Sequence, residues 1–269
     1  MNKFVLVMAY FDDNDNRMKL IEQYARPKFQ QFADMHNLKY IEKNKSNYIP
    51  IMLHDDLPFR ENFHYNNWLV LDSYINDGTL KDGDIVYRYD SDVYIAKPEN
   101  FFIPEKSFTY AIDSGNSHCM GFYIIKINDF SKKLIKNIIS KERYAKLKNY
   151  SFFNEHDNIK RPFTVLADQQ SYYTCAGIKP HSWTPFYDLP NHGFHSYPTE
   201  HTIFTLDELI NNVQILPTEW NVTHLLEETG QYGQRNTYDI VHCTKEKTIN
   251  RHFAGGQSWN FKEWKEYKP

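Results

Sequence analysis

Cysteine and long hydrophobic runs are the two features that this sequence of 269 residues has least of. Its three cysteines lie far apart, at Cys119, Cys175 and Cys243. An odd and sparse set argues against a disulfide framework and is typical of a reducing compartment. The apolar run near the start is too short for a secretory signal, and no segment approaches the ~20 apolar residues of a membrane span. We therefore expect a cytoplasmic protein.

An excess of charge of one sign is also missing. The chain has 31 Lys and Arg against 34 Asp and Glu, which gives a net charge of -3. This balance lacks the strongly basic character of general nucleic-acid-binding proteins, so we expect no nucleic acid among the partners. Basic residues gather in residues 131 to 148, around an apolar stripe. This pattern predicts a solvated outer helix, with peripheral contact to an anionic membrane as the alternative.

The opening of the chain has the pattern of an α/β fold. Phe4 to Tyr10 is a continuous β-prone apolar run, typical of a buried parallel strand. Residues 17 to 36 carry apolar side chains at helical spacing, interrupted by Pro27, where we expect a turn or a kink. Residues 38 to 41 are a second strand candidate. Strand, helix and strand in this order predict a mixed, mostly parallel sheet with helices on both faces.

Later segments extend this α/β pattern. Helical spacing from Trp68 to Ile75 ends at Asp77-Gly78, which is a helix-terminating signal. The remaining strand candidates are residues 85–89, 108–112, 121–127, 213–216 and 238–242. The chain length fits one large domain.

The most informative motif is a pair of carboxylates that follows a predicted strand. The strand from Ile85 to Tyr89 ends in Asp90-Ser91-Asp92. Carboxylates at positions i and i+2 of an extended backbone point to the same side, where they can hold one hard divalent cation. A diphosphate can complete the coordination of that cation, which then neutralises the charge that builds on the departing diphosphate.

A second Asp-x-Asp pair provides an internal comparison. Asp82-Gly83-Asp84 precedes the same strand and lies in a glycine turn. Ligands of open α/β sheets bind at the carboxyl ends of the strands, so position selects Asp90 and Asp92. A solvated acidic turn is the alternative interpretation of the selected pair.

Together with three later segments, this motif resembles the GT-A glycosyltransferases that carry an Asp-x-Asp motif. The segments are Ala167-Asp168-Gln169-Gln170, Leu216-Pro217-Thr218-Glu219-Trp220-Asn221, and the late pair Tyr238–His242 and His252–Trp259. Among these enzymes, the chain is similar to the retaining glycogenin-like, galactomannan galactosyltransferase, and capsular or mannosyl transferase groups. The resemblance implies a GT-A fold and transfer of a sugar from a nucleotide-sugar donor, a UDP-sugar, with Mn²⁺ or Mg²⁺ as the cofactor.

The resemblance also implies a division of the chain and a set of partners. Residues 1–269 form a single GT-A domain, with the donor half in 1–130. The acceptor half and a C-terminal lid that carries a metal ligand lie in 131–269. The acceptor is a glycan, a lipid-linked molecule or a protein, and the reaction retains the configuration of the sugar.

The same resemblance implies roles for individual residues. Asp90 and Asp92, with Ser91 between them, hold the metal and the donor, and a late histidine completes the metal site. His242 ends a predicted strand, where a rigid ligand belongs, whereas His252 has the better flanking match. We favour His252 and keep His242 open. Asp168 and Gln169 are the catalytic candidates near the reacting carbon.

Contacts to the nucleotide are predicted for the end of the first strand, for Arg60 and for a segment near the C-terminus. Ala9 and Tyr10 lie at the end of the first strand, where Tyr10 can stack on a uracil or, alternatively, pack in the core. Arg60 can pair with a diphosphate or remain a surface arginine. Trp259 follows Gly255 and Gly256, whose backbone freedom suits a lid over the diphosphate.

The chain departs from the family pattern in two places. Gln257-Ser258-Trp259 stands where the glycogenin-like group has Lys-Pro-Trp, and His118-Cys119-Met120-Gly121 stands where Asn-x-Gly is usual. The diphosphate and donor contacts that the family makes there are therefore not carried over.

Two other functions share this architecture. A non-catalytic nucleotide-sugar or glycan-binding module would keep the fold without the chemistry. A sugar nucleotidyltransferase would need a Gly-rich basic loop after the first strand, whereas Asp12-Asp13-Asn14-Asp15 at that place would repel a triphosphate.

Overall fold

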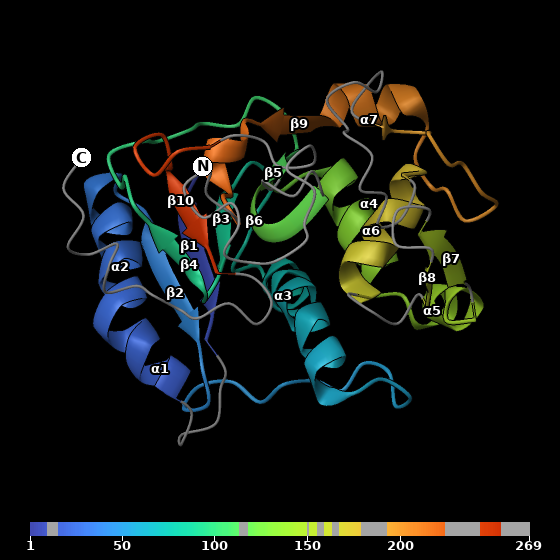
Figure 1. Ribbon diagram of the computed structural model, residues 1–269, viewed down its shortest axis with the longest axis horizontal. Helices are drawn as coiled ribbons and strands as arrows, with labels where there is room; N and C mark the ends of the chain where they lie inside the picture. Colours follow the sequence, from blue (N-terminus) through green and yellow to red (C-terminus); the bar gives the residue numbers. More distant parts are fainter. Residues whose placement is uncertain are drawn as a thin grey trace. The chain divides into compact units, whose positions relative to one another are not determined.

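A computed structural model of the chain describes residues 1–9, 16–112, 118–149, 151–154, 159–162, 167–178, 193–223 and 243–253, with the backbone alone at residues 60, 151–154, 159–162 and 167 (Figure 1). The chain divides into two compact units. Unit 1 comprises residues 1–48, 84–126 and 214–269, and unit 2 comprises residues 49–83 and 127–213. Each unit therefore combines segments that are distant in the sequence.

Unit 1 is built on a six-stranded sheet in the order β2-β1-β3-β6-β5-β9 (Figure 1). Its strands are β1 (Lys3–Met8), β2 (Lys39–Lys43), β3 (Ile85–Asp90), β5 (Phe108–Ile112), β6 (His118–Lys126) and β9 (Val213–Leu216). Strand β1 runs parallel to both β2 and β3, whereas β6 runs antiparallel to β3 and β5. The predicted α/β fold with a mixed sheet is therefore confirmed.

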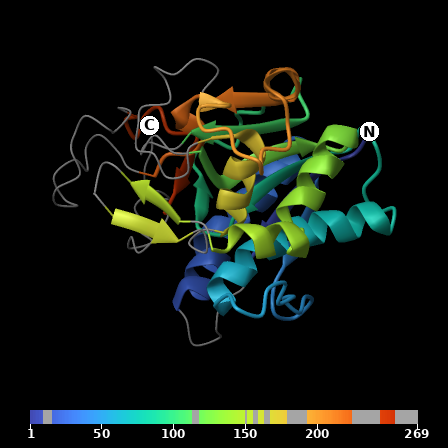
Figure 2. The same ribbon diagram turned by 90° about the vertical axis from the view of Figure 1, so that its right-hand side faces the viewer.

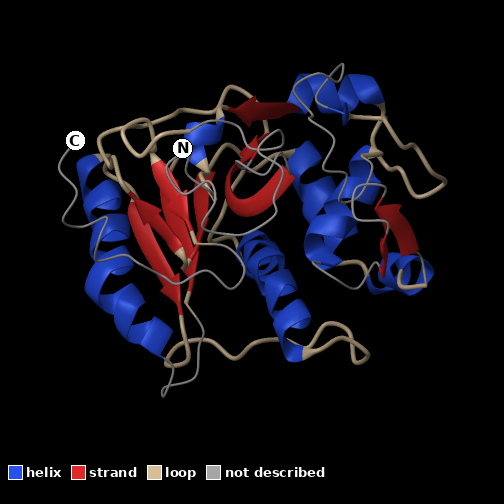
Figure 3. Ribbon diagram, in the orientation of Figure 1, coloured by secondary structure: helices blue, strands red, loops and turns tan. Residues whose placement is uncertain are grey.

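Helical residues pack along this sheet and bury an aromatic core. Helices α1 (Asn16–Leu20) and α2 (Arg26–Met35) lie on one side of the strands in Figure 3. Phe29 and Phe32 of α2 are buried against Tyr87 and Tyr89 of β3, with ring centroids 5.4 to 6.1 Å apart. Burial of such large rings supplies much of the energy of a core.

The predicted interruption at Pro27 takes the form of a change in helix geometry. Residues 21 to 25 form a π-helical turn, in which the N–H of Arg26 donates to the carbonyl of Ile21, and α2 continues directly after it. Proline has no N–H to donate and its ring clashes with the carbonyl four residues earlier. The wider π turn accommodates both effects, so the chain stays helical from Asn16 to Met35.

Strand β3 is followed at once by a second, smaller ribbon. After a turn at Ser91 and Asp92 the chain enters β4 (Val93–Ile95), which pairs antiparallel with β10 (Asn250–His252). In this register His252 lies opposite Val93. A late segment of the chain is thereby fixed beside the end of β3.

Unit 2 is mainly helical. Its elements are α3 (Phe59–Asn76), α4 (Asp129–Ile138), α5 (Lys141–Leu147), α6 (Ala167–Ala176), α7 (Leu206–Asn212) and the antiparallel pair β7 (Ser151–Asn154) and β8 (Ile159–Pro162), which Figure 2 shows as a separate ribbon. Helices α3, α4 and α6 pack on one another. The fully buried Trp68, Leu134 and Tyr172 come from these three helices.

The basic segment 131 to 148 forms two helices and not the single one predicted. Helix α4 ends at Ile138, and Ser140 caps α5 by accepting from the backbone N–H of Arg143. The apolar stripe at Leu134, Ile135 and Ile138 is buried. That stripe is therefore core, and membrane contact through this segment would have to use its charged face alone.

Most other predicted elements match the structure. The strands predicted at 108–112 and 213–216 have the observed bounds, and the helix predicted from Trp68 begins earlier, at Phe59. The strand predicted at 238–242 lies outside the described residues. In the part of the chain that the structure describes, no helix combines the length and apolarity needed to cross a bilayer.

Candidate metal centre

The two candidate carboxylates lie at the junction of β3 and β4. Asp90 is the last residue of β3, and Asp92 lies in the two-residue turn that leads into β4. The sequence analysis placed both carboxylates on an extended backbone. This was wrong, because Asp92 lies in the turn and not in the strand. The side chains are 37% and 19% exposed, so both carboxylates remain accessible.

His252 is brought to these carboxylates by the pairing of β10 with β4. Its Nε2 lies 3.4 Å from Asp92 Oδ1 and 3.8 Å from Asp90 Oδ2. The backbone N–H of Phe253 donates to the carbonyl of Asp92 at 3.0 Å, which ties the two segments next to the turn. One ligand atom from each of Asp90, Asp92 and His252 lies within 4.8 Å of the others.

The imidazole of His252 packs closely against the backbone of Gly121 in unit 1. A Cβ added to Gly121 of β6 would lie 2.2 Å from His252 Cε1 and 2.6 Å from Nδ1, so only glycine leaves room for the ring. Nδ1 lies 3.1 Å from Asn221 Oδ1 and 3.6 Å from Cys119 Sγ. The ring is therefore enclosed on one side, while Nε2 faces the two carboxylates.

Arg88 balances part of the negative charge. It belongs to β3, two residues before Asp90, and therefore points to the same side of the strand. Its guanidinium is buried and donates to Asp90 Oδ1 and, at 2.5 Å, to the carbonyl of Met120. A paired arginine next to two carboxylates reduces their mutual repulsion and holds one oxygen of Asp90 in place.

The electrostatics of His252 follow from its burial beside the carboxylates. Burial alone would lower its pKa, but the Asp92 carboxylate raises it, and the resulting pKa is well above that of a free imidazole. A cation can bind at Nε2 only when that nitrogen carries a lone pair, so binding to a protonated ring releases a proton.

The geometry and chemistry of the three side chains fit a divalent cation. In octahedral coordination with bonds of 2.0 to 2.1 Å, neighbouring ligand atoms are about 3 Å apart and opposite ones about 4.2 Å. The observed separations from Nε2, 3.4 and 3.8 Å, fall within this range. Carboxylates suit Mg²⁺ and Mn²⁺, and an imidazole ligand shifts the preference towards a transition metal such as Mn²⁺.

The structure describes only some of the other residues predicted to bind the metal or the donor. Ala9 is fully buried at the carboxyl end of β1, where its N–H donates to the carbonyl of Lys43, and Ser91 is buried in the turn between the two aspartates. The side chain of Arg60 and all of Tyr10, His242 and Trp259 lie outside the described residues. Their roles remain predictions.

Asp168 and Gln169 belong to unit 2, in the first turn of α6. Asp168 Oδ2 accepts from the indole Nε1 of Trp68 at 3.2 Å, and Oδ1 lies 3.9 Å from His64 Nδ1. Gln169 Nε2 donates to the hydroxyl of Tyr173 at 2.7 Å. Asp168 is thus a carboxylate held among aromatic and histidine side chains, and its catalytic role remains a prediction.

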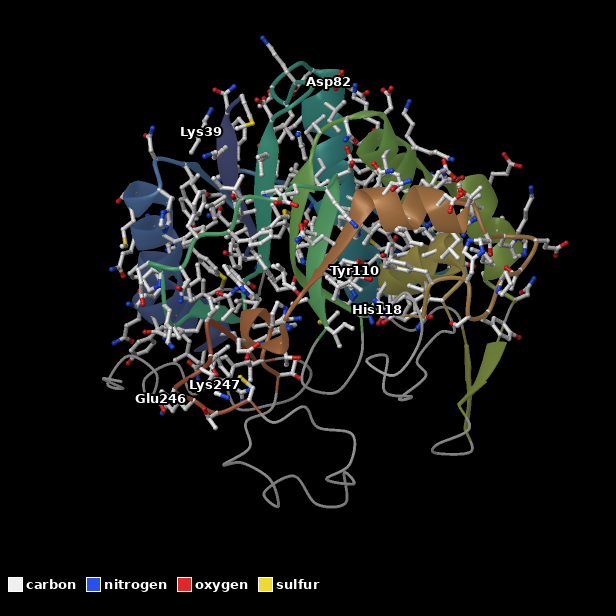
Figure 4. The ribbon with its side chains drawn as sticks, turned by 90° about the horizontal axis from the view of Figure 1, so that it is seen from above. Lys39, Asp82, Tyr110, His118, Glu246 and Lys247 are labelled. Atoms are coloured by element: carbon white, nitrogen blue, oxygen red, sulfur yellow. The ribbon has the colours of Figure 1, made fainter. Side chains whose placement is uncertain are left out.

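Sequence reasoning missed three residues that surround His252. Asn221 was noticed only as the end of the Leu216–Asn221 motif, and Cys119 and Gly121 only as a departure from the family pattern. Beside them, Tyr110 and His118 form a buried hydrogen-bonded pair where β5 and β6 meet (Figure 4). The motif was the available signal for Asn221, but nothing in the sequence showed that it faces His252.

Comparison with known proteins shows a similarity of fold but none of sequence. No family model and no curated protein matches the sequence. Among solved structures, the fold is similar to that of a glycosyltransferase involved in the glycosylation of the major capsid of PBCV-1, with a TM-score of 0.51 and 9% sequence identity over 99% of this chain and 100% of that one. At this identity the similarity shows a shared fold and no more.

Proposed function

We propose that this protein is a metal-dependent glycosyltransferase that moves a sugar from a nucleotide-sugar donor to an acceptor. The observation that carries the proposal is the convergence of Asp90, Asp92 and His252 from two distant segments of the chain. The fold similarity to a glycosyltransferase supports the same conclusion independently of these residues.

Asp90, Asp92 and His252 would hold a divalent cation, Mn²⁺ or Mg²⁺. When bound, that cation would bind the diphosphate of the donor and stabilise the negative charge of the leaving nucleotide. The carboxylates supply two negative charges at a strand end, where ligands of open α/β sheets bind. Arg88 keeps Asp90 oriented, and Gly121 leaves space for the ring of His252.

Asp168 is the proposed catalytic carboxylate, with Gln169 beside it. A carboxylate can stabilise the positive charge that develops on the sugar carbon as the bond to the diphosphate breaks. The indole N–H of Trp68 donates to one oxygen of Asp168 and holds that carboxyl group in position. We assign the donor to the UDP-sugars and the reaction to the retaining class, with a glycan, a lipid-linked molecule or a protein as acceptor.

A thermal-shift screen of nucleotide sugars with Mn²⁺ tests the proposal. A ligand at 100 times its Kd adds about 2.7 kcal/mol to the stability of the protein that binds it. A UDP-sugar should therefore raise the melting temperature with Mn²⁺ and much less with EDTA. Donor hydrolysis measured under the same two conditions separates an enzyme from a binding module.

Two different results would contradict two different parts of the proposal. Stabilisation by a nucleotide sugar that is unaffected by EDTA would refute the metal assignment. Metal-dependent stabilisation without hydrolysis or transfer to any offered acceptor would favour the non-catalytic module.

A further inference from the structure

Asn221 occupies the side of the His252 ring that faces away from the carboxylates. Its Oδ1 lies 3.1 Å from His252 Nδ1, which is within hydrogen-bond distance. Cys119 Sγ lies 3.6 Å from the same nitrogen, and a thiol is the weaker acceptor. Asn221 is fully buried, so no water competes for this contact.

The backbone around Asn221 is fixed on both sides. The N–H of Asn221 donates to the carbonyl of Thr218 at 2.8 Å, at the end of the 3₁₀ turn Thr218–Trp220. The next residue, Val222, is bridged to Arg251, and its carbonyl accepts from the N–H of His252 at 2.9 Å. Asn221 is therefore held against His252 by main-chain bonds that do not depend on its side chain.

The identity of the atom that faces Nδ1 decides what Nε2 can do. A neutral imidazole carries its proton on one nitrogen and a lone pair on the other. With the amide oxygen of Asn221 at Nδ1, the proton resides on Nδ1 and the lone pair of Nε2 is directed at Asp90 and Asp92. With the amide nitrogen there, the proton would move to Nε2 and the ring would be unable to bind a cation on that side.

The surroundings of Asn221 do not impose the opposite orientation. Its Nδ2 is buried and has no hydrogen-bond partner among the residues that the structure describes. Turning the amide would therefore gain nothing for the other end of the side chain. In the structure the amide oxygen is the end of the side chain that faces Nδ1.

We propose that Asn221 is a positioning residue of the metal centre, which accepts the Nδ1–H of His252 and thereby directs the Nε2 lone pair at Asp90 and Asp92. The inference rests on the proposed function in so far as His252 binds a cation. Residues that hold a metal-binding histidine in this way contribute about 10- to 100-fold to metal affinity in other proteins.

The test uses Asn221→Leu, which removes the acceptor at similar volume, and Asn221→Asp, which keeps an acceptor. Free Mn²⁺ is measured by electron paramagnetic resonance, without nucleotide. We expect Asn221→Leu to weaken Mn²⁺ binding about 10- to 100-fold and Asn221→Asp to bind at least as tightly as the parent. In a His252→Ala background, Asn221→Leu should change the remaining affinity by less than about twofold, because its only route to the metal is gone.

Three results would overturn the inference. The first is Mn²⁺ binding by Asn221→Leu that equals that of the parent. The second is a loss of Mn²⁺ affinity from Asn221→Leu that persists in the His252→Ala background. The third is a loss of Mn²⁺ affinity in Asn221→Asp, which would show that the amide N–H of Asn221 is the group that matters. If Asn221→Leu does not fold, the Asn221→Asp result still decides between the two orientations.

A second measurement needs no metal. At a pH where the ring is neutral, the ¹⁵N signals of His252, assigned by their loss in His252→Ala, should show Nδ1 protonated and Nε2 unprotonated in the metal-free protein. An unprotonated Nδ1 overturns the inference. A protonated Nδ1 in a protein that binds no Mn²⁺ supports the hydrogen bond to Asn221 and overturns the metal assignment of the proposed function, so the two failures can be told apart.

Discussion

The carboxylates of unit 1 and the carboxylate of unit 2 are held in opposite ways. Asp90 and Asp92 are partly exposed and face the imidazole that we propose as a third metal ligand. Asp168 is 9% exposed, and one of its oxygens accepts from the indole of Trp68. A carboxylate that binds a cation must keep lone pairs accessible, whereas one that acts by its charge benefits from a fixed and enclosed position.

This difference predicts two kinds of sensitivity. The unit 1 cluster should respond to any change that displaces a ligand atom, because coordination needs several atoms at once. Asp168 should respond to loss of charge more than to loss of shape. Substitutions of matched size separate these two kinds of response.

Asp92→Ala should have the largest effect. It removes one of the three proposed ligands from a partly exposed turn, so the fold should persist. Transfer should fall by about a thousandfold, which corresponds to the several kcal/mol of charge stabilisation that a metal supplies. The measurement is the steady-state rate with saturating Mn²⁺, together with a thermal melt to confirm folding.

Asp82→Ala is the matched control for that experiment. Asp82 belongs to the other Asp-x-Asp pair, is 67% exposed and pairs with Lys132 on the surface of unit 2 (Figure 4). Its removal should leave transfer within about twofold of the parent, because exposed ion pairs contribute little. Full activity of Asp92→Ala would contradict the assignment of the cluster.

Asp168→Asn should have the next largest effect. Asparagine can still accept from Trp68 Nε1 and still suits the first turn of α6, so the shape of the site is kept and the charge is lost. If that charge stabilises the transition state, the rate should fall on the order of a hundredfold or more. A loss of only a few-fold would make Asp168 a structural residue.

Gly121→Ala should lower the affinity for Mn²⁺ itself, even when no nucleotide is present. The added methyl group would overlap the ring of His252 and force it out of line with Asp90 and Asp92. We expect about a tenfold or greater loss of Mn²⁺ affinity, comparable with losses from disturbed supporting residues, measured by calorimetry.

Gly83→Ala separates this effect from general strain. Gly83 has φ of 90°, which disfavours alanine, but an added Cβ would meet no atom within 4 Å. The substitution should cost stability and leave Mn²⁺ affinity unchanged. Unaltered Mn²⁺ binding in Gly121→Ala would show that His252 does not need its observed position.

Apart from the controls, Trp68→Phe should have the smallest effect on rate. It removes the indole N–H from Asp168 and keeps an aromatic ring in the core, so activity should fall a few-fold and stability by about 1–3 kcal/mol, the cost of a lost donor to a buried charge. Denaturant unfolding measures this cost. The loss of stability from Trp68→Phe should be smaller in an Asp168→Asn background than in the parent. An equal loss in the two backgrounds would show that the hydrogen bond to Asp168 is not its cause.

The sequence alone predicted the fold class and the strand that carries Asp90, because a buried strand followed by an acidic turn is a local pattern. The pairing of β10 with β4 was not predictable in this way, since it joins segments far apart in the chain and β10 has only three residues. His252 was favoured from its flanking residues, and the structure places it beside Asp92. Asn221, Gly121 and Cys119 became visible only through that pairing.

Local signals were also present that the sequence analysis did not use. Ser140 lies three residues before Arg143 in the middle of a basic helical pattern and acts as a cap, which divides the pattern into α4 and α5. The π turn before Pro27 shows the reverse case, in which a strong helix-breaking signal is absorbed by a change of helix geometry. Both outcomes depend on backbone hydrogen bonds that composition and periodicity do not specify.

The most direct test of the central claim is the binding of Mn²⁺ to the parent protein and to the Asp92→Ala, His252→Ala and Asp82→Ala variants, measured with and without UDP. The account predicts one Mn²⁺ per chain, tightened by UDP, retained in Asp82→Ala and lost in the other two variants. Mn²⁺ binding that is equal in the parent, Asp92→Ala and His252→Ala would contradict it.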